Sequence, residues 1–203
     1  RTSPTNMGLA LLANLAAHDF GYISGREMAE RCNNTMRTML KLERYKGHFY
    51  NWYDTLSLFP LHPRYVSTVD SGNLVGFLLT LRQGLLSQAN EPIFKKSFYE
   101  GLITIVKIIQ ENSRKHDEKK TERIIAVLNT ALNEYSNSLG SVKRCMDELS
   151  SLISDLSSTP ADAESKKWIS KLSVQLNSFY NDLLQIVPWI KLLPVPEHFE
   201  KLH

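Results

Sequence analysis

The chain has 203 residues, of which 42% are hydrophobic, and a formal net charge of +3. That hydrophobic content is sufficient for a globular core, which excludes an intrinsically disordered chain. The densest basic pairs, Lys119-Lys120 and Lys166-Lys167, sit beside glutamates. The charge pattern therefore argues against a nucleic-acid-binding surface.

The chain carries no targeting or membrane signal. No apolar run reaches the roughly 18 residues that a membrane-spanning helix needs. It opens on Arg-Thr-Ser-Pro, with neither a signal peptide nor an initiator Met, so we expect a soluble fragment of a longer protein. Cys32 and Cys145 both fall on apolar helix faces, which predicts two free buried thiols and favours a reducing compartment.

Two helices are predicted before residue 42. From Thr5, an expected N-cap, to His18 the residues are apolar on nearly every side, which is typical of a helix buried all round. Gly21 then breaks the chain and Ser24 is the expected cap of a one-sided helix. Its predicted buried stripe is Met28, Cys32, Met36, Met39 and Leu40.

A long aromatic loop, residues 43–73, separates these helices from the next pair. Its rings alternate with charged and amide side chains and show no helical or strand period. Ordinary connections have about four to six residues, so a loop of this length is usually functional. Flat rings beside hydrogen-bonding groups suit a sugar, whose C–H face packs on a ring while its hydroxyls need polar partners. Packing of a buried connection is the alternative interpretation.

The alternation of helix types then repeats. Asp70 or Ser71 is expected to cap a helix that is apolar all round and runs to Gln88. After Glu91-Pro92, an amphipathic helix is predicted from Phe94 to Ile109. Buried and amphipathic helices in alternation are what two concentric rings of antiparallel helices require, so residues 1–112 are predicted to form the first part of an (α/α) toroid.

Residues 113–203 are predicted to add a helical bundle to this all-α fold. A solvated linker or frayed helix end over residues 113–120 precedes an amphipathic helix that ends at Gly140. Apolar residues at three-four spacing then run from Val142 to Leu156 and from Ile169 to Ile186, which predicts long helices packed along narrow seams. The proline-rich tail, residues 188–196, is expected to be an extended strap.

Few residues of the chain could carry chemistry. The histidines His48 and His62 lack HxxxH or CxxC spacing, and GxSxG, GxGxxG and Walker motifs are absent, so neither a metal nor a cofactor is expected. The carboxylates near the aromatic rings are Glu43, Asp54 and Asp70, and glycosyl transfer needs two. Each also has a structural alternative: an ion pair for Glu43, a turn for Asp54 and a helix cap for Asp70.

Three motifs in order give the chain a family resemblance. They are residues 1–6 (Arg-Thr-Ser-Pro-Thr-Asn), residues 42–55 (Leu-Glu-Arg-Tyr-Lys-Gly-His-Phe-Tyr-Asn-Trp-Tyr-Asp-Thr) and residues 60–74 (Pro-Leu-His-Pro-Arg-Tyr-Val-Ser-Thr-Val-Asp-Ser-Gly-Asn-Leu). In these motifs the chain resembles the glucoamylase-like central domain of cyclic β-1,2-glucan synthases. The likeness is strong over about the first 110 residues.

The resemblance implies a role within a large bacterial enzyme at the cytoplasmic face of the inner membrane. That enzyme closes a linear β-1,2-glucan into a ring by transglycosylation. The acid/base and nucleophile glutamates of the family are expected in stretches of the kind Phe-Glu-Tyr-Leu and Ser-Glu-Ser, which this chain lacks. We therefore expect the parent to be a glycosyltransferase and this piece to be inactive, with Asp54 and Asp70 as weak catalytic candidates. The expected substrate-binding residues are Arg1, Thr2, His48, Tyr50, Asn51, Trp52, Tyr53, Asp54, Arg64, Tyr65, Asp70 and Asn73.

Two functions remain open from the sequence. The first is the carbohydrate-binding part of a glucan-processing site, whose partners are β-1,2-glucan and the remaining domains of the parent. The second is a non-catalytic helical scaffold or protein-interaction module. Because the all-round apolar helices lack some of the cover that a complete toroid provides, self-association of the chain is also expected.

Overall fold

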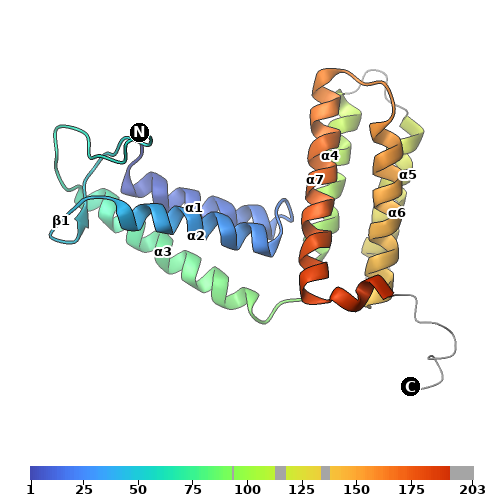
Figure 1. Cartoon of the computed structure of the whole chain (residues 1–203), viewed down its shortest axis with the longest axis horizontal. Coiled ribbons are helices and arrows are strands. Elements are labelled where there is room, and N and C mark those ends of the chain that lie inside the picture. The colour runs from blue at the N-terminus through green and yellow to red at the C-terminus, as the bar shows by residue number, and fades with distance from the viewer. Residues whose placement is uncertain (93, 113–117, 134–137, 193–203) are drawn as a thin grey trace. The chain divides into compact units, whose positions relative to one another are not determined.

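The computed structural model describes residues 1–92, 94–112, 118–133 and 138–192, which are mostly helical apart from the long loop at residues 42–67 (Figure 1). The expected all-α fold is confirmed. The helices are α1 (Pro4–Asp19), α2 (Gly25–Lys41), α3 (Thr68–Gln88), α4 (Lys96–Asn112), α5 (Glu118–Asn133), α6 (Leu139–Ser157), α7 (Ala163–Ile186) and the 3₁₀ helix η1 (Pro188–Leu192). Two short strands, β1 (Arg44–Tyr45) and β2 (His48–Phe49), form an antiparallel hairpin.

The chain divides into two compact units. The first contains residues 1–19 and 25–91, and the second contains residues 20–24 and 92–203. The sequence had suggested a division at residue 112, after α4. In the structure α4 belongs to the second unit because its buried side chains, among them Phe98 and Leu102, join the core of the later helices.

In the first unit α1 packs against both α2 and α3. Two glycines permit the close approach of α1 and α3. A Cβ placed on Gly8 would lie 2.5 Å from Cδ2 of Phe77, and one placed on Gly84 would meet the side chain of Leu15. Because residue 8 faces 77 and residue 15 faces 84, α1 and α3 run parallel.

The expectation that α1 and α3 are buried all round is wrong for this chain. Leu74 and Leu81 are buried in α3, whereas Leu79 is 60% exposed. The reason is that α3 packs mainly on α1, so only one side of it is covered. The exposed apolar residues of α3 are Val69, Val75, Leu79, Leu85 and Leu86.

The stripe predicted for α2 is correct in part. Met28, Cys32 and Met39 are buried, but Met36 is partly exposed and Leu40 is 74% exposed. Adjacent residues lie about 100° apart around a helix, so burial of Met39 against α1 turns Leu40 away.

The caps of α1 and α3 differ from those predicted. Ser67, not Asp70 or Ser71, is the N-cap of α3: its backbone is extended and its hydroxyl accepts from Asp70 N at 3.1 Å. At the start of α1, Ser3 Oγ accepts from Asn6 N at 3.3 Å, and Pro4 occupies the first helical position, where proline is favoured. Thr5 was the expected cap, but its hydroxyl donates to the carboxylate of Asp70 instead.

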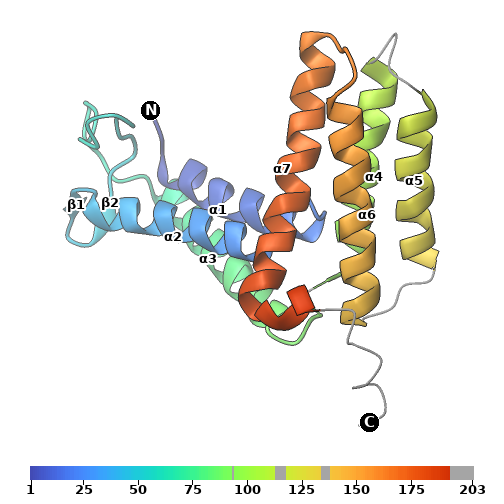
Figure 2. The ribbon, with the colours of Figure 1, turned by 45° about the vertical axis from the view of Figure 1, so that its right-hand side comes forward.

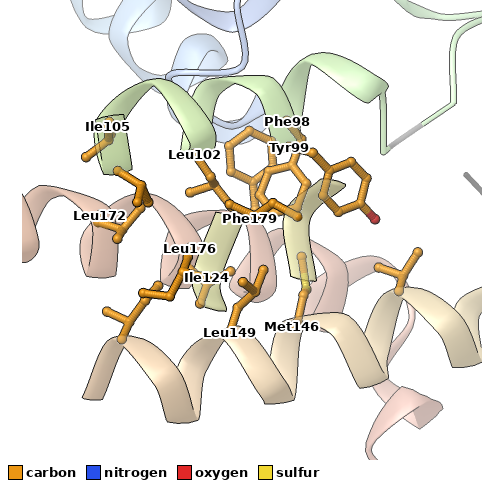
Figure 3. Packing of buried hydrophobic residues seen from close by; sticks show 14 of the residues in the cluster. Phe98, Tyr99, Leu102, Ile105, Ile124, Met146, Leu149, Leu172, Leu176 and Phe179 are labelled. Atoms are coloured by element: carbon orange, nitrogen blue, oxygen red, sulfur yellow. The ribbon is translucent and has the colours of Figure 1, made fainter. Parts of the chain in front are cut away.

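The second unit is a four-helix arrangement in which α4 packs on α5 and α7, and α6 packs on the same two helices. Figure 2 shows these helices side by side. Their apolar seams meet in one core, where the rings of Phe98 and Phe179 lie 4.5 Å apart (Figure 3). The bundle predicted from the three-four spacing is present, with α4 as an additional member.

Two boundaries in the second unit also differ from the sequence prediction. Gly140 does not end a helix but lies in the first turn of α6, whose N-cap is Ser138. The tail is not an extended strap over residues 188–192, which form η1 with Ile190 fully buried. Of the segment 113–120 predicted as a linker or frayed helix end, residues 118–120 form the first turn of α5. Residues 113–117 and the end of the tail fall outside the described residues.

Candidate functional site

The loop between α2 and α3 begins with the β1–β2 hairpin. Lys46 and Gly47 form its two-residue turn with positive φ values of 48° and 88°, as a type I′ turn requires. The guanidinium of Arg44 lies 4.2 Å from the centre of the Phe49 ring. His48 and Tyr45 are both exposed on this hairpin.

Tyr53 anchors the loop to the start of the chain. Its backbone exchanges two hydrogen bonds with Thr2, both 2.9 Å long. Its hydroxyl donates to the carbonyl of Glu43 at 2.7 Å and accepts from Tyr50 N at 2.8 Å. The side chain is fully buried, so its ring holds the loop together and is not accessible to a ligand in this conformation.

A second set of hydrogen bonds joins the loop to the helices through Asn51 and Asp70. With the amide nitrogen of Asn51 facing Asp70, it donates to Asp70 Oδ2 at 2.8 Å. The amide oxygen then accepts from Trp52 Nε1 at 2.6 Å and from the Tyr65 hydroxyl at 2.5 Å. Asn51 is buried, so these bonds satisfy a polar group that would otherwise be costly to bury.

The same carboxylate connects α1 to α3. Thr5 Oγ1 donates to Asp70 Oδ1 at 2.6 Å and accepts from Asn73 Nδ2 at 3.1 Å. At the edge of this network the guanidinium of Arg1 lies 4.7 Å from the centre of the Trp52 ring. We call these residues the Asp70 cluster: Arg1, Thr5, Asn51, Trp52, Tyr65, Asp70 and Asn73.

Asp70 is held in its ionised form. Burial acts to raise its pKa, but hydrogen bonds from Thr5, Ser67 and Ser3 outweigh this and keep the pKa below the ordinary aspartate value. A general acid needs a pKa near the working pH. Asp70 is therefore suited to accept hydrogen bonds and not to donate a proton at neutral pH.

Asp54 is occupied within its own turn. Its Oδ1 accepts from Leu56 N at 2.9 Å, from Ser57 N at 2.7 Å and from the Ser57 hydroxyl at 3.0 Å. The bonds from Ser57 and Leu56 lower the pKa of Asp54. This is the turn-forming role that the sequence offered as the alternative to catalysis.

Arg64 and Glu43 form a separate pair in the loop. Arg64 Nη1 lies 3.2 Å from Glu43 Oε1, and its guanidinium lies 5.9 Å from the centre of the Tyr50 ring. Both charged side chains are exposed, so this pair contributes little to stability.

The structure thus brings together six of the expected binding residues: Arg1, Asn51, Trp52, Tyr65, Asp70 and Asn73. Four other expected residues lie outside this cluster. His48 lies on the hairpin and Asp54 in its own turn, and Tyr50 and Arg64 form the smaller group with Glu43. Thr5 was missed as a member of the cluster because its sequence signal was that of a helix cap. Nothing in the sequence indicated that its hydroxyl would meet Asp70.

Across residues 1–92, 94–112, 118–133 and 138–192, no three His, Cys, Asp or Glu side chains gather as a metal site, and no helix is long and apolar enough to cross a membrane. Cys32 and Cys145 are free, as expected. Cys32 is buried and Cys145 partly so, and burial raises the pKa of Cys145 to about 11, which makes it a poor nucleophile.

The fold and the Asp70 cluster define a class: an all-α protein whose first three helices carry an aromatic loop with sugar-compatible groups. No protein-family model matches the chain. It is, however, 35% identical over 147 residues to the cyclic β-(1,2)-glucan synthase NdvB of Rhizobium meliloti strain 1021. The match covers 71% of this chain and 5% of that protein. The resemblance to cyclic β-1,2-glucan synthases is thereby confirmed, for a segment that is a small part of the relative's length.

Proposed function

We propose that this chain provides the carbohydrate-binding part of a site that acts on β-1,2-linked glucan. The observation that carries the proposal is the hydrogen-bonded series from Trp52 through Asn51 to Asp70, with the exposed side chains of Tyr65 and Asn73 beside it. Trp52 is half-buried and fixed at its indole nitrogen, so a ring face is held in one orientation. Pre-ordered aromatic rings bind sugars at a lower entropic cost than mobile ones.

The arrangement of α1, α2 and α3 supports the proposal that the first unit, residues 1–19 and 25–91, belongs to an (α/α) toroid of the parent protein. Helices α1 and α3 contact each other in parallel, and α2 packs on α1. In a toroid, alternate helices form the inner ring and their intervening partners the outer ring. The exposed apolar residues of α3 agree with neighbours supplied by other parts of a longer chain. The location of the parent at the cytoplasmic face of the inner membrane rests on the family resemblance.

The parent activity that we infer is closure of a linear glucan into a ring by transglycosylation, to which this segment contributes binding groups. Asp54 and Asp70 both have lowered pKa values, so neither suits the general acid of glycosyl transfer. We expect the isolated chain to leave linear β-1,2-glucan unchanged when the products are followed by mass spectrometry. Rings or shortened chains that disappear in Asp70→Asn would contradict this assignment.

A helical interaction module is the second candidate function. The observation that favours it is that Val75, Leu79 and Leu86 are exposed on one face of α3, and apolar residues grouped on a surface mark interaction sites. In that case the aromatic loop would only pack, and glucan would not bind.

Replacement of Trp52 tests the two functions against each other. Trp52→Ala should weaken the binding of a β-1,2-glucan oligosaccharide by about 1–3 kcal/mol, the scale of a truncated aromatic anchor. The measurement is isothermal titration calorimetry on the parent glucan-binding domain, with circular dichroism to confirm folding.

Tyr45→Ala is the matched control, because Tyr45 is another exposed ring of the same loop but lies on the hairpin outside the Asp70 cluster. Its effect should be clearly smaller. Equal affinity of the wild type and a folded Trp52→Ala variant would favour the interaction module.

A further inference from the structure

A hollow of about 370 Å³ lies between α1, α2 and the turn at residues 54–58. It shares no residue with the Asp70 cluster. Its volume falls at the lower end of the range for small-molecule sites, which suits a ligand of one or two rings.

The floor of the hollow is apolar and its mouth carries amides. Met7, Met39 and Leu42 line it and are each no more than 7% exposed. Asn6 of α1 and Asn34 of α2 also line it, and both are exposed. Within the described part of the chain their side-chain amides have no hydrogen-bond partner. Each amide offers both donors and an acceptor to a ligand.

The charge that lines the hollow belongs to Asp54, and one of its two carboxylate oxygens is already engaged. Asp54 is the one ionisable carboxylate that lines it, and its Oδ1 already accepts three hydrogen bonds from Leu56 and Ser57. The remaining polar lining consists of four threonines, the two asparagines and Tyr53, whose hydroxyl is already hydrogen-bonded to Glu43 and Tyr50. The lining therefore disfavours an anion, and it suits a neutral ligand whose hydroxyls donate to the carboxylate of Asp54 and bond the two amides.

One wall of the hollow is formed at a conformational cost. Leu58 lines it with a φ of +64°, a left-handed conformation that disfavours any residue other than glycine. Two backbone bonds of 3.0 Å hold it there, from Leu58 N to Asp54 O and from Asp54 N to Phe59 O. Strain of this kind persists where the surroundings enforce it, and it is common at ligand-binding walls.

We propose that this hollow binds a single neutral pyranose unit. The apolar face of the ring would lie on Met7 and Met39, and neighbouring hydroxyls would exchange hydrogen bonds with Asn6 and Asn34. Hydroxyls both donate and accept, as primary amides do, which matches the two sides of the mouth. The choice of a sugar over another neutral molecule rests on the proposed glucan-related function, whereas the site itself rests on the hollow.

Nuclear magnetic resonance of the ¹⁵N-labelled chain tests the proposal, with methyl β-glucoside as the probe. The side-chain amide signals of Asn6 and Asn34 should shift on titration. Binding should weaken at least tenfold in the double variant Asn6→Ala/Asn34→Ala. Asn33→Ala is the matched control, since Asn33 is exposed on α2 beside Asn34 but does not line the hollow, and it should bind as the wild type does.

Trp52→Ala separates this site from the proposed function. If that variant keeps the amide shifts, the hollow is an independent sugar site, whether or not glucan binds at the Asp70 cluster. Absence of shifts at both asparagines, or equal binding by the double variant, overturns the proposal. Shifts with hexan-1-ol but none with the glucoside also overturn it, by showing that the hollow takes apolar molecules.

Discussion

At the scale of single residues, the loop is organised by polar groups whose partners lie far away in the sequence. The carboxylate of Asp70 accepts hydrogen bonds from Thr5 of α1 and from Asn51 of the loop. The backbone of Tyr53 exchanges hydrogen bonds with that of Thr2. The pKa of Asp70 lies below its ordinary value because these bonds favour the carboxylate. The ionised form of Asp70 therefore stabilises the first unit.

The first prediction is that Asp70 makes stability depend on pH in the acid range. A carboxylate with a lowered folded-state pKa stabilises the fold above its unfolded pKa, about 4, and loses this contribution as the pH falls through the folded value. Asp70→Asn should lower the free energy of unfolding at pH 7 by about 1–3 kcal/mol, the range for hydrogen bonds to a charged group. It should also flatten the decline below pH 4.

Urea denaturation at several pH values provides this measurement, with Glu30→Gln as the control. Glu30 is an exposed member of a surface pair with Arg26, so its replacement should leave the acid decline in place. An Asp70→Asn variant with an unchanged pH profile would show that the cluster does not depend on the charge.

At the scale of elements, glycines decide how α1 and α3 meet. Gly8 and Gly84 leave room for Phe77 and Leu15, whereas a Cβ on Gly76 would meet nothing within 4 Å. The packing therefore requires glycine at positions 8 and 84, whereas position 76 has room for a larger side chain.

The second prediction concerns these positions. Gly8→Ala should destabilise the first unit by about 1–3 kcal/mol because its methyl group would overlap the Phe77 ring. Gly84→Ala should cost less, since the tip of Leu15 can move. Gly76→Ala should instead stabilise by up to about 1 kcal/mol, the difference in helix propensity. Thermal unfolding followed by circular dichroism distinguishes these signs, and a neutral Gly8→Ala would show that the helices can separate.

At the scale of the whole molecule, the two units differ in how well their apolar residues are covered. The second unit encloses a continuous core, in which residues such as Leu149 and Leu183 are fully buried. In the first unit Val75, Leu79 and Leu86 of α3 are each more than half exposed. Arg82 is exposed on the same face, but its long side chain can extend to solvent, so a second copy can cover the three apolar side chains.

The third prediction is that the chain self-associates through α3. Light scattering at micromolar concentration should report a dimer or larger species, and Leu79→Glu should shift it toward the monomer by placing a charge on that face. Leu56→Glu is the control, since Leu56 is 93% exposed but lies in the loop. A wild-type monomer that binds no hydrophobic dye would contradict the prediction.

The sequence by itself determined the helical class, the bundle seams and the family resemblance, because periodicity and contiguous motifs are local properties of a chain. Three-four spacing placed Leu149 and Leu176 in a core, and the order of the motifs around Trp52 indicated a resemblance to cyclic glucan synthases that the similarity to NdvB confirmed. Only the tertiary structure decided which residues that are far apart in the sequence contact one another. Thr5 was predicted to be a helix cap, but its hydroxyl donates a hydrogen bond to Asp70. Leu79 was predicted to be buried and is exposed, and α4 belongs to the second unit. Each of these depends on which element packs against which, and side-chain burial follows from that packing and not from local pattern.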